Sequence, residues 1–182
     1  INKVNPICFG QSVELTATGG ESGKYKWNNG SSNDMTTVTP SRPGVNTYNV
    51  SGVDGNGCKN YASIDVTVND LPKVEILMDS DYVCRGYETQ LTVNATGNGA
   101  FSYEWHENGK AITGANAETF KATISNDTII WAVVTDANTC VDSASTIVRV
   151  KEFPVLSHRT STGRDSVCKE SDITLYVSGA DN

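Results

Sequence analysis

Residues 6–20 read PICFGQSVELTATGG, and the same pattern returns as YVCRGYETQLTVNATG at 82–97 and as SVCKESDITLYVSG at 166–179. In each copy a leucine follows the cysteine by seven residues, at Leu15, Leu91 and Leu175. Apolar and polar residues alternate around each leucine, which is typical of a strand with one buried face. Such self-similarity at a fixed period predicts a repeat architecture.

A second motif returns at a similar spacing, as VDGNGC at 53–58 and TDANTC at 135–140. A repeat of about 80 residues matches the size of a small all-β sandwich. We therefore predict an all-β chain of tandem β-sandwich domains arranged end to end. The expected domains are residues 1–70, residues 71–152 and, in residues 153–182, the N-terminal part of a third repeat. Because the third copy stops about one strand after Cys168, we expect the chain to be a fragment of a longer array.

The two complete repeats share an aromatic-x-Trp strand, an Asn-Gly turn that favours a hairpin, and an alternating closing strand. These are Tyr25-Lys26-Trp27 and Tyr103-Glu104-Trp105, Asn29-Gly30 and Asn108-Gly109, and residues 62–68 and 144–150. Each closing strand runs within two residues into an apolar–Pro pair, Leu71-Pro72 or Phe153-Pro154. So short a connection leaves little free linker and predicts a semi-rigid rod, whereas a flexible string of beads is the alternative.

The chain has five cysteines, and the repeat suggests how they pair. We expect one disulfide within each complete repeat, Cys8–Cys58 and Cys84–Cys140, with Cys168 left without a partner in this chain. Without the repeat, four cysteines would allow three connectivities. The repeat is what favours this one. Disulfides indicate an oxidising compartment. Each closure is worth about 4 kcal/mol in the chain-entropy model, so Cys58→Ser should destabilise the protein strongly.

The bulk composition excludes several classes of function. A formal net charge of −7 leaves no basic stripe to displace phosphate counterions, which argues against nucleic-acid binding. No apolar run approaches the ~20 residues that span a bilayer, and no signal peptide is recognisable in this sequence.

Together these motifs resemble the immunoglobulin-like/PKD-like tandem repeats of very large surface proteins of the Bacteroidota. Those proteins are secreted by the type IX route and include gliding-motility adhesins. The likeness rests on the Cys8-Phe9-Gly10 opening, LTATGG at 15–20, the aromatic-x-Trp and Asn-Gly pair, and the Asp-x-Asn-Gly-Cys close. It covers the whole chain and is more specific for the repeat type than for one protein. Thr139 and Glu170 depart from it, because each replaces a glycine beside a cysteine.

The resemblance implies a structural or adhesive stalk segment of a large repetitive adhesin on the bacterial cell surface, of the kind that includes gliding-related adhesins. Neighbouring repeats of the same chain are the expected partners, together with a surface polysaccharide or protein ligand. The alternatives are a carbohydrate- or protein-binding module and an accessory domain of a secreted enzyme. A binding module needs exposed aromatic side chains, for which Tyr61, Tyr87 and Trp131 are the candidates.

No catalytic, metal or cofactor site is expected. His106 and His158 fall in different repeats, and no nucleophile elbow or phosphate loop is present. Zinc would need closely spaced cysteines or histidines. Asp54-Gly55-Asn56 and Asp136-Ala137-Asn138 superficially resemble calcium loops, but we interpret them as turns in which the side chain bonds its own backbone.

Three Asp-Ser/Thr-apolar triplets resemble the O-glycosylation signal of these bacteria. They make Thr128, Ser143 and Ser166 candidate attachment sites.

Overall fold

The computed structural model describes residues 2–154, 157–160 and 175–178, and every regular element in this part of the chain is a β-strand. The prediction of an all-β protein is therefore confirmed. The strands are β1 (Ile7–Cys8), β2 (Val13–Thr16), β3 (Lys26–Trp27), β4 (Met35–Val38), β5 (Gly44–Val53), β6 (Lys59–Asn69), β7 (Lys73–Met78), β8 (Tyr82–Cys84), β9 (Glu88–Thr96), β10 (Ser102–Glu107), β11 (Lys110–Ala111), β12 (Thr119–Thr123), β13 (Thr128–Thr135), β14 (Val141–Lys151), β15 (Ser157–Thr160) and β16 (Leu175–Ser178).

Strands β1 to β6 form two sheets, which we call the N-terminal sheet pair. One has the strand order β1-β6-β5-β3 and the other contains β2 and β4. Leu15 and Val38 from the smaller sheet pack with Trp27, Val50 and Val66 from the larger one in a single buried cluster. The alternating residues of these strands thus bury one face each, as the sequence pattern predicted.

Strands β7 to β14 form a second set of two sheets, the central sheet pair. Its orders are β11-β10-β13-β14-β8 and β12-β9-β7. Leu91 and Val93 from one sheet pack with Trp105, Ile130 and Val148 from the other in a second buried cluster. The run β8-β14-β13-β10 repeats the order β1-β6-β5-β3, so the sequence repeat is also a topological repeat.

The two buried tryptophans occupy equivalent places. Trp27 pairs with Val50 on β5, and Trp105 pairs with Ala132 on β13. Each indole Nε1 donates a hydrogen bond to a backbone carbonyl, of Asn33 and Ala117 respectively, at 2.8 Å. A buried indole N–H needs such a partner, so both rings are fixed in orientation as well as buried.

Strand β7 was not foreseen as a strand. It follows the Leu71-Pro72 pair directly and pairs antiparallel with β9, from Lys73 opposite Thr96 to Met78 opposite Leu91. Its inward residues contact the second cluster at every other position. Residues 73–78 alternate in the sequence as a strand should. The Leu71-Pro72 pair before them is typical of a junction between domains, so no strand was predicted there.

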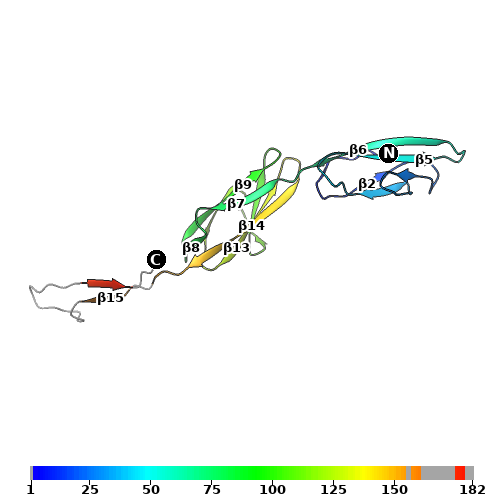
Figure 1. Cartoon of the computed structure of the whole chain (residues 1–182). Helices are drawn as coiled ribbons and strands as arrows, with labels where there is room; N and C mark the ends of the chain where they lie inside the picture. The colour runs from blue at the N-terminus through cyan, green and yellow to red at the C-terminus, as the bar shows by residue number, and fades with distance from the viewer. Residues whose placement is uncertain (1, 155–156, 161–174, 179–182) are drawn as a thin grey trace, which may run out of the picture.

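The two sheet pairs lie end to end in Figure 1, with β15 beyond the central pair. They are connected by Asp70, Leu71 and Pro72, and Pro72 is fully buried. A Cβ at Gly97 would lie 3.2 Å from the Cα of Pro72, so the connection packs closely on the loop after β9. Within the described residues there is no helix of the length and apolarity needed to span a membrane.

Candidate functional site

The feature that joins the two sheet pairs covalently is a disulfide between Cys8 and Cys140. Their Cα atoms are 5.5 Å apart, and 132 residues separate them in sequence. The predicted pairings Cys8–Cys58 and Cys84–Cys140 are therefore wrong. Cys58 and Cys84 are both exposed free cysteines, and Cys168 lies outside the described residues.

Strand geometry explains why a bond within the N-terminal sheet pair is impossible. Cys8 ends β1, which runs parallel to β6 and pairs with its last residue, Asn69. Cys58 immediately precedes the first residue of β6, a strand of 11 residues. At about 3.3 Å per residue the two cysteines are separated by about 36 Å. A disulfide requires Cα atoms closer than about 7 Å.

The same argument holds for the central sheet pair. Cys84 ends β8 and pairs with Lys151, the last residue of β14. Cys140 precedes the first residue of that strand, which also has 11 residues. In each sheet pair the first cysteine therefore lies beside the C-terminal end of the closing strand, β6 or β14. The second cysteine lies at the N-terminal end of the same strand. End-to-end stacking brings Cys8 of one sheet pair to Cys140 of the next.

The loop that presents the second cysteine of each repeat, here called the second-cysteine turn, is residues 54–58 or 136–140. In the bonded copy, Asp136 Oδ1 accepts hydrogen bonds from the backbone N–H groups of Asn138 and Cys140, both at 2.9 Å. The N–H of Asp136 donates to the carbonyl of Cys140 at 2.9 Å, and that of Thr139 donates to the carbonyl of Asp136 at 3.0 Å. Four hydrogen bonds therefore fix this turn, and two of them are made by the Cys140 backbone.

The unbonded copy has the same four hydrogen bonds. Asp54 Oδ1 accepts from the N–H groups of Asn56 at 3.0 Å and Cys58 at 2.8 Å. The N–H of Asp54 donates to Cys58, and that of Gly57 donates to Asp54, each at 3.0 Å. Both aspartates bond their own backbone, as the interpretation of these motifs as turns predicted.

The first-cysteine turns, residues 8–11 and 84–87, are also alike. The N–H groups of Phe9 and Arg85 donate to the carbonyls of Asn69 and Lys151, at 2.8 and 2.9 Å. Two residues further on, Gln11 and Tyr87 close the turns on the carbonyls of Cys8 and Cys84, at 3.0 Å each. The glycine between has positive φ in both copies, 86° at Gly10 and 76° at Gly86.

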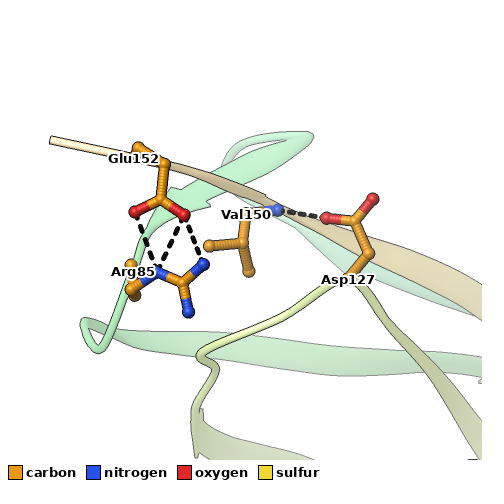
Figure 2. Close-up of polar contacts among 4 residues, drawn as sticks. All are labelled: Arg85, Asp127, Val150 and Glu152. Carbon is orange, nitrogen blue, oxygen red and sulfur yellow. Dashed lines mark hydrogen bonds and ion pairs between the residues drawn. The ribbon is translucent and has the colours of Figure 1, made fainter. Parts of the chain in front are cut away.

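The free Cys84 end of the molecule carries an exposed ion pair (Figure 2). The guanidinium of Arg85 donates from Nε to both carboxylate oxygens of Glu152, at 2.9 and 2.8 Å. This hydrogen bond lowers the pKa of Glu152 and raises that of Arg85. Beside it, Asp127 Oδ1 accepts from the N–H of Val150 at 2.7 Å, replacing the strand partner that β13 no longer supplies there.

The predicted glycosylation residues lie in different environments. Thr128 is 7% exposed, and its hydroxyl donates to the carbonyl of Asn126 at 2.7 Å, so the folded protein does not present it to a transferase. Ser143 is exposed on β14. Ser166 lies outside the described residues.

The predicted aromatic candidates are exposed but are not brought together. Tyr61 lies on β6 under the Lys59 ammonium, 4.9 Å from its ring centre. Tyr87 lies at the first-cysteine turn against Phe153, with ring centres 5.6 Å apart. Trp131 pairs with His106 in the larger central sheet. Three separate positions do not make a platform.

Two further titratable groups of the central sheet pair, His106 and Tyr103, have polar or charged neighbours. His106 is half-buried on β10, and its Nε2 lies 3.0 Å from Oε1 of Glu104. Burial raises the pKa of Tyr103, and the charge of Glu118 raises it further. Within the described residues, no three His, Cys, Asp or Glu side chains gather in a way that could hold a metal ion.

No protein-family model and no curated protein matches this chain. Among solved structures, it is similar to the N-terminal eight immunoglobulin domains of Down Syndrome Cell Adhesion Molecule, with 13% identity and a TM-score of 0.57. That match covers 86% of this chain and 24% of the other, so the chain spans about a quarter of the structure that it matches.

Weaker likenesses are to fibronectin(III)-like modules of Clostridium thermocellum CbhA and to extracellular domains 3–5 of Drosophila OTK. The first has 12% identity, covers 81% of this chain and 88% of the other, and has a TM-score of 0.41. The second has 10% identity, covers 81% of this chain and 59% of the other, and has a TM-score of 0.45. The likeness to the Down Syndrome Cell Adhesion Molecule domains shows that the fold of the chain is immunoglobulin-like.

Proposed function

We propose that this chain is a segment of a repetitive extracellular stalk, built from immunoglobulin-like modules in tandem, on a bacterial cell-surface adhesin. The modules are residues 1–70 and 71–152, and residues 153–182 begin a third. The segment acts by length, stiffness and display. Its closest functional setting, from the sequence resemblance, is a large type IX-secreted adhesin of the Bacteroidota, including those that serve gliding.

The single observation that carries this proposal is the Cys8–Cys140 disulfide. It connects the N-terminal sheet pair, beside the last residue of β6, to the central sheet pair, just before β14. The segment Asp70, Leu71 and Pro72 connects the same two sheet pairs a second time. Two covalent connections restrict bending and rotation between modules far more than one short linker does. A stable disulfide also supports an extracellular or secreted location, because cytosolic thiols are kept reduced.

A ligand-binding module is the competing proposal, and the positions of the aromatic side chains argue against it. Tyr61, Tyr87 and Trp131 lie on separate elements, so these three side chains do not form a common aromatic platform. The resemblance in fold to a cell-adhesion molecule supports an adhesive or structural role, with protein partners, without specifying a ligand.

Small-angle scattering on the whole chain, compared with a Cys140→Ser variant, tests the stalk. If the proposal is correct, the native protein has a narrow distribution of end-to-end distances, with each 11-residue closing strand contributing about 36 Å to the length. The variant should show a broader distribution at unchanged strand content. A compact particle, or no difference between the two proteins, would contradict the proposal.

The surface location is tested separately on intact cells of the source organism. An antibody raised against the chain should label whole cells, and the label should be lost after mild external proteolysis. Labelling that appears only after the cells are opened would reject the extracellular location.

A further inference from the structure

The two free cysteines lie on copies of the two turns that form the observed disulfide. Cys84 ends β8 as Cys8 ends β1, in the same pairing with the last residue of a closing strand. Cys58 precedes β6 as Cys140 precedes β14. Cys84, the equivalent of Cys8, is therefore exposed at the end of the central sheet pair that faces away from the junction. Cys58, the equivalent of Cys140, is exposed at the corresponding end of the N-terminal sheet pair.

The end that carries Cys84 also exposes apolar side chains. Phe153 is 50% exposed and Tyr87 is 62% exposed, although their rings contact one another. Phe153 follows the closing strand by two residues, as Leu71 does at the junction between the sheet pairs, where Leu71 is half-buried and Pro72 is fully buried. The equivalent Pro154 is exposed. Among the described residues, this end thus has the parts of the junction, and its apolar side chains are exposed.

The end that carries Cys58 has a hollow of about 420 Å³ beside the cysteine, bordered by Gly19, Gly20 and Tyr25. Gly19 and Gly20 lie in the loop after β2, as Gly97 lies in the loop after β9. In the central sheet pair Gly97 lies against Pro72, which is part of the segment that connects this sheet pair to the N-terminal one. The hollow therefore lies where the apolar–Pro segment that connects a preceding module would pack.

We propose that Cys84 and Cys58 are the two halves of the same inter-module disulfide, and that each bonds the complementary turn of an adjacent module of the same kind. Cys84 bonds the second-cysteine turn of the module that follows it, and Cys58 bonds the first-cysteine turn of the module that precedes it. Each bond thus joins two neighbouring modules in addition to the peptide linker between them. We call the resulting series of disulfides between successive modules the disulfide ladder. This inference rests on the proposed tandem stalk.

The interface is head-to-tail, because the two contacting ends are different surfaces. Such an interface does not close on itself and can continue through any number of modules. Bond formation needs a disulfide oxidant, such as glutathione disulfide. The Cys84 thiolate attacks it and releases one glutathione thiolate; the neighbouring cysteine thiolate then attacks the mixed disulfide and releases the second. Two protein thiols become one disulfide, and one glutathione disulfide becomes two glutathione thiols.

The test is a chain in which residues 1–152 are followed directly by a second copy of residues 71–152. Leu71-Pro72 of the second copy then takes the place of Phe153-Pro154. After refolding with reduced and oxidised glutathione, free thiols are alkylated and the linked peptides are mapped by mass spectrometry. We expect Cys84 of the first copy to be linked to Cys140 of the second. Cys58 and the second-copy Cys84 should be alkylated.

The Cys8–Cys140 link of the first copy is the internal control, because it reports correct folding in every variant. Cys84→Ser in the first copy should free Cys140 of the second copy for alkylation, whereas Cys58→Ser should change no link. An alkylated first-copy Cys84 in a protein that retains Cys8–Cys140 would overturn the proposal.

Scattering on the same chains separates this inference from the proposed stalk. An elongated particle with a free first-copy Cys84 would reject the disulfide ladder and leave the stalk standing. A linked Cys84 in a compact, folded-back particle would reject the stalk and leave the pairing of the two turns standing.

Discussion

Cys58 and Cys8 lie at opposite ends of one strand: Cys58 precedes β6, and Cys8 pairs with Asn69, its last residue. Cys8 therefore bonds Cys140 of the next sheet pair, although Cys58 belongs to its own. We predict that the isolated 182-residue chain, folded and alkylated without reduction, carries label on Cys58 and Cys84 and none on Cys8 or Cys140. Peptide mapping by mass spectrometry measures this directly. Label on Cys140 would show that the two sheet pairs are not linked.

Cys140→Ser should lower the stability of the oxidised protein, whereas the matched variant Cys58→Ser should leave it unchanged. In the chain-entropy model, closing a loop of 132 residues stabilises by about 5 kcal/mol, as an upper bound if the sheet pairs unfold together. Urea titration of both variants checks this. The result reverses the expectation from sequence, in which Cys58 was a bonded residue. Equal loss in both variants would mean that Cys58 has a structural role that the fold does not explain.

Trp105→Ala should destabilise the central sheet pair by about 3–5 kcal/mol, because it empties a fully buried site. It also leaves the carbonyl of Ala117 without its indole donor. Trp27→Ala is the matched variant in the N-terminal sheet pair. In a Cys140→Ser background, calorimetry should show each substitution lowering a different transition. A common shift of both transitions would indicate a single cooperative unit.

Thr139→Gly should stabilise the protein slightly. Thr139 has a φ of 64°, a left-handed conformation that disfavours a β-branched residue, whereas the equivalent Gly57 has a φ of 81° without that cost. The gain is partly offset by the larger freedom of glycine in the unfolded chain, so about 0.5–1 kcal/mol is expected. The reciprocal change Gly57→Thr should destabilise. Denaturant titration of the two variants should give opposite signs.

Acidification should break the ion pair between Arg85 and Glu152 at the Cys84 end. The hydrogen bond from Arg85 lowers the pKa of Glu152 below its ordinary value of 4.5. A carboxylate with a lowered folded-state pKa contributes stability that is present above the unfolded pKa and is lost as the pH falls through the folded one. The carboxyl resonance of Glu152, followed by NMR, should titrate below pH 4.5 and return to 4.5 in Arg85→Ala. If the pKa of Glu152 in the native protein is not below 4.5, the ion pair with Arg85 does not form in solution.

The sequence predicted much of the fold because the relevant signals are local. Alternation around Leu15 and Leu91 predicted buried strands, and both residues are fully buried. Asn108 and Gly109 have φ angles of 47° and 82°, and they connect the paired strands β10 and β11 as a hairpin. The aromatic-x-Trp pattern correctly placed Trp27 and Trp105 in the cores.

The cysteine pairing could not be obtained in the same way, because a repeat is equally consistent with bonds within and between modules. The deciding information is non-local: β1 and β8 run parallel to the closing strands, which carries Cys8 and Cys84 to the ends opposite Cys58 and Cys140. One signal was available in the spacing. Each second cysteine directly precedes a long closing strand. A first cysteine that lies beside the far end of that strand is too distant to bond the second cysteine of the same repeat.

The bond between Cys8 and Cys140 also decides what happens when the molecule is pulled from its ends. Tension entering at the N-terminus reaches Cys8 after a few residues and passes through one sulfur–sulfur bond to Cys140. The stretch between them, a sequence separation of 132 and about 460 Å of contour length, stays out of the line of load. A stalk joined in this way would hold its reach under force and lengthen only after reduction.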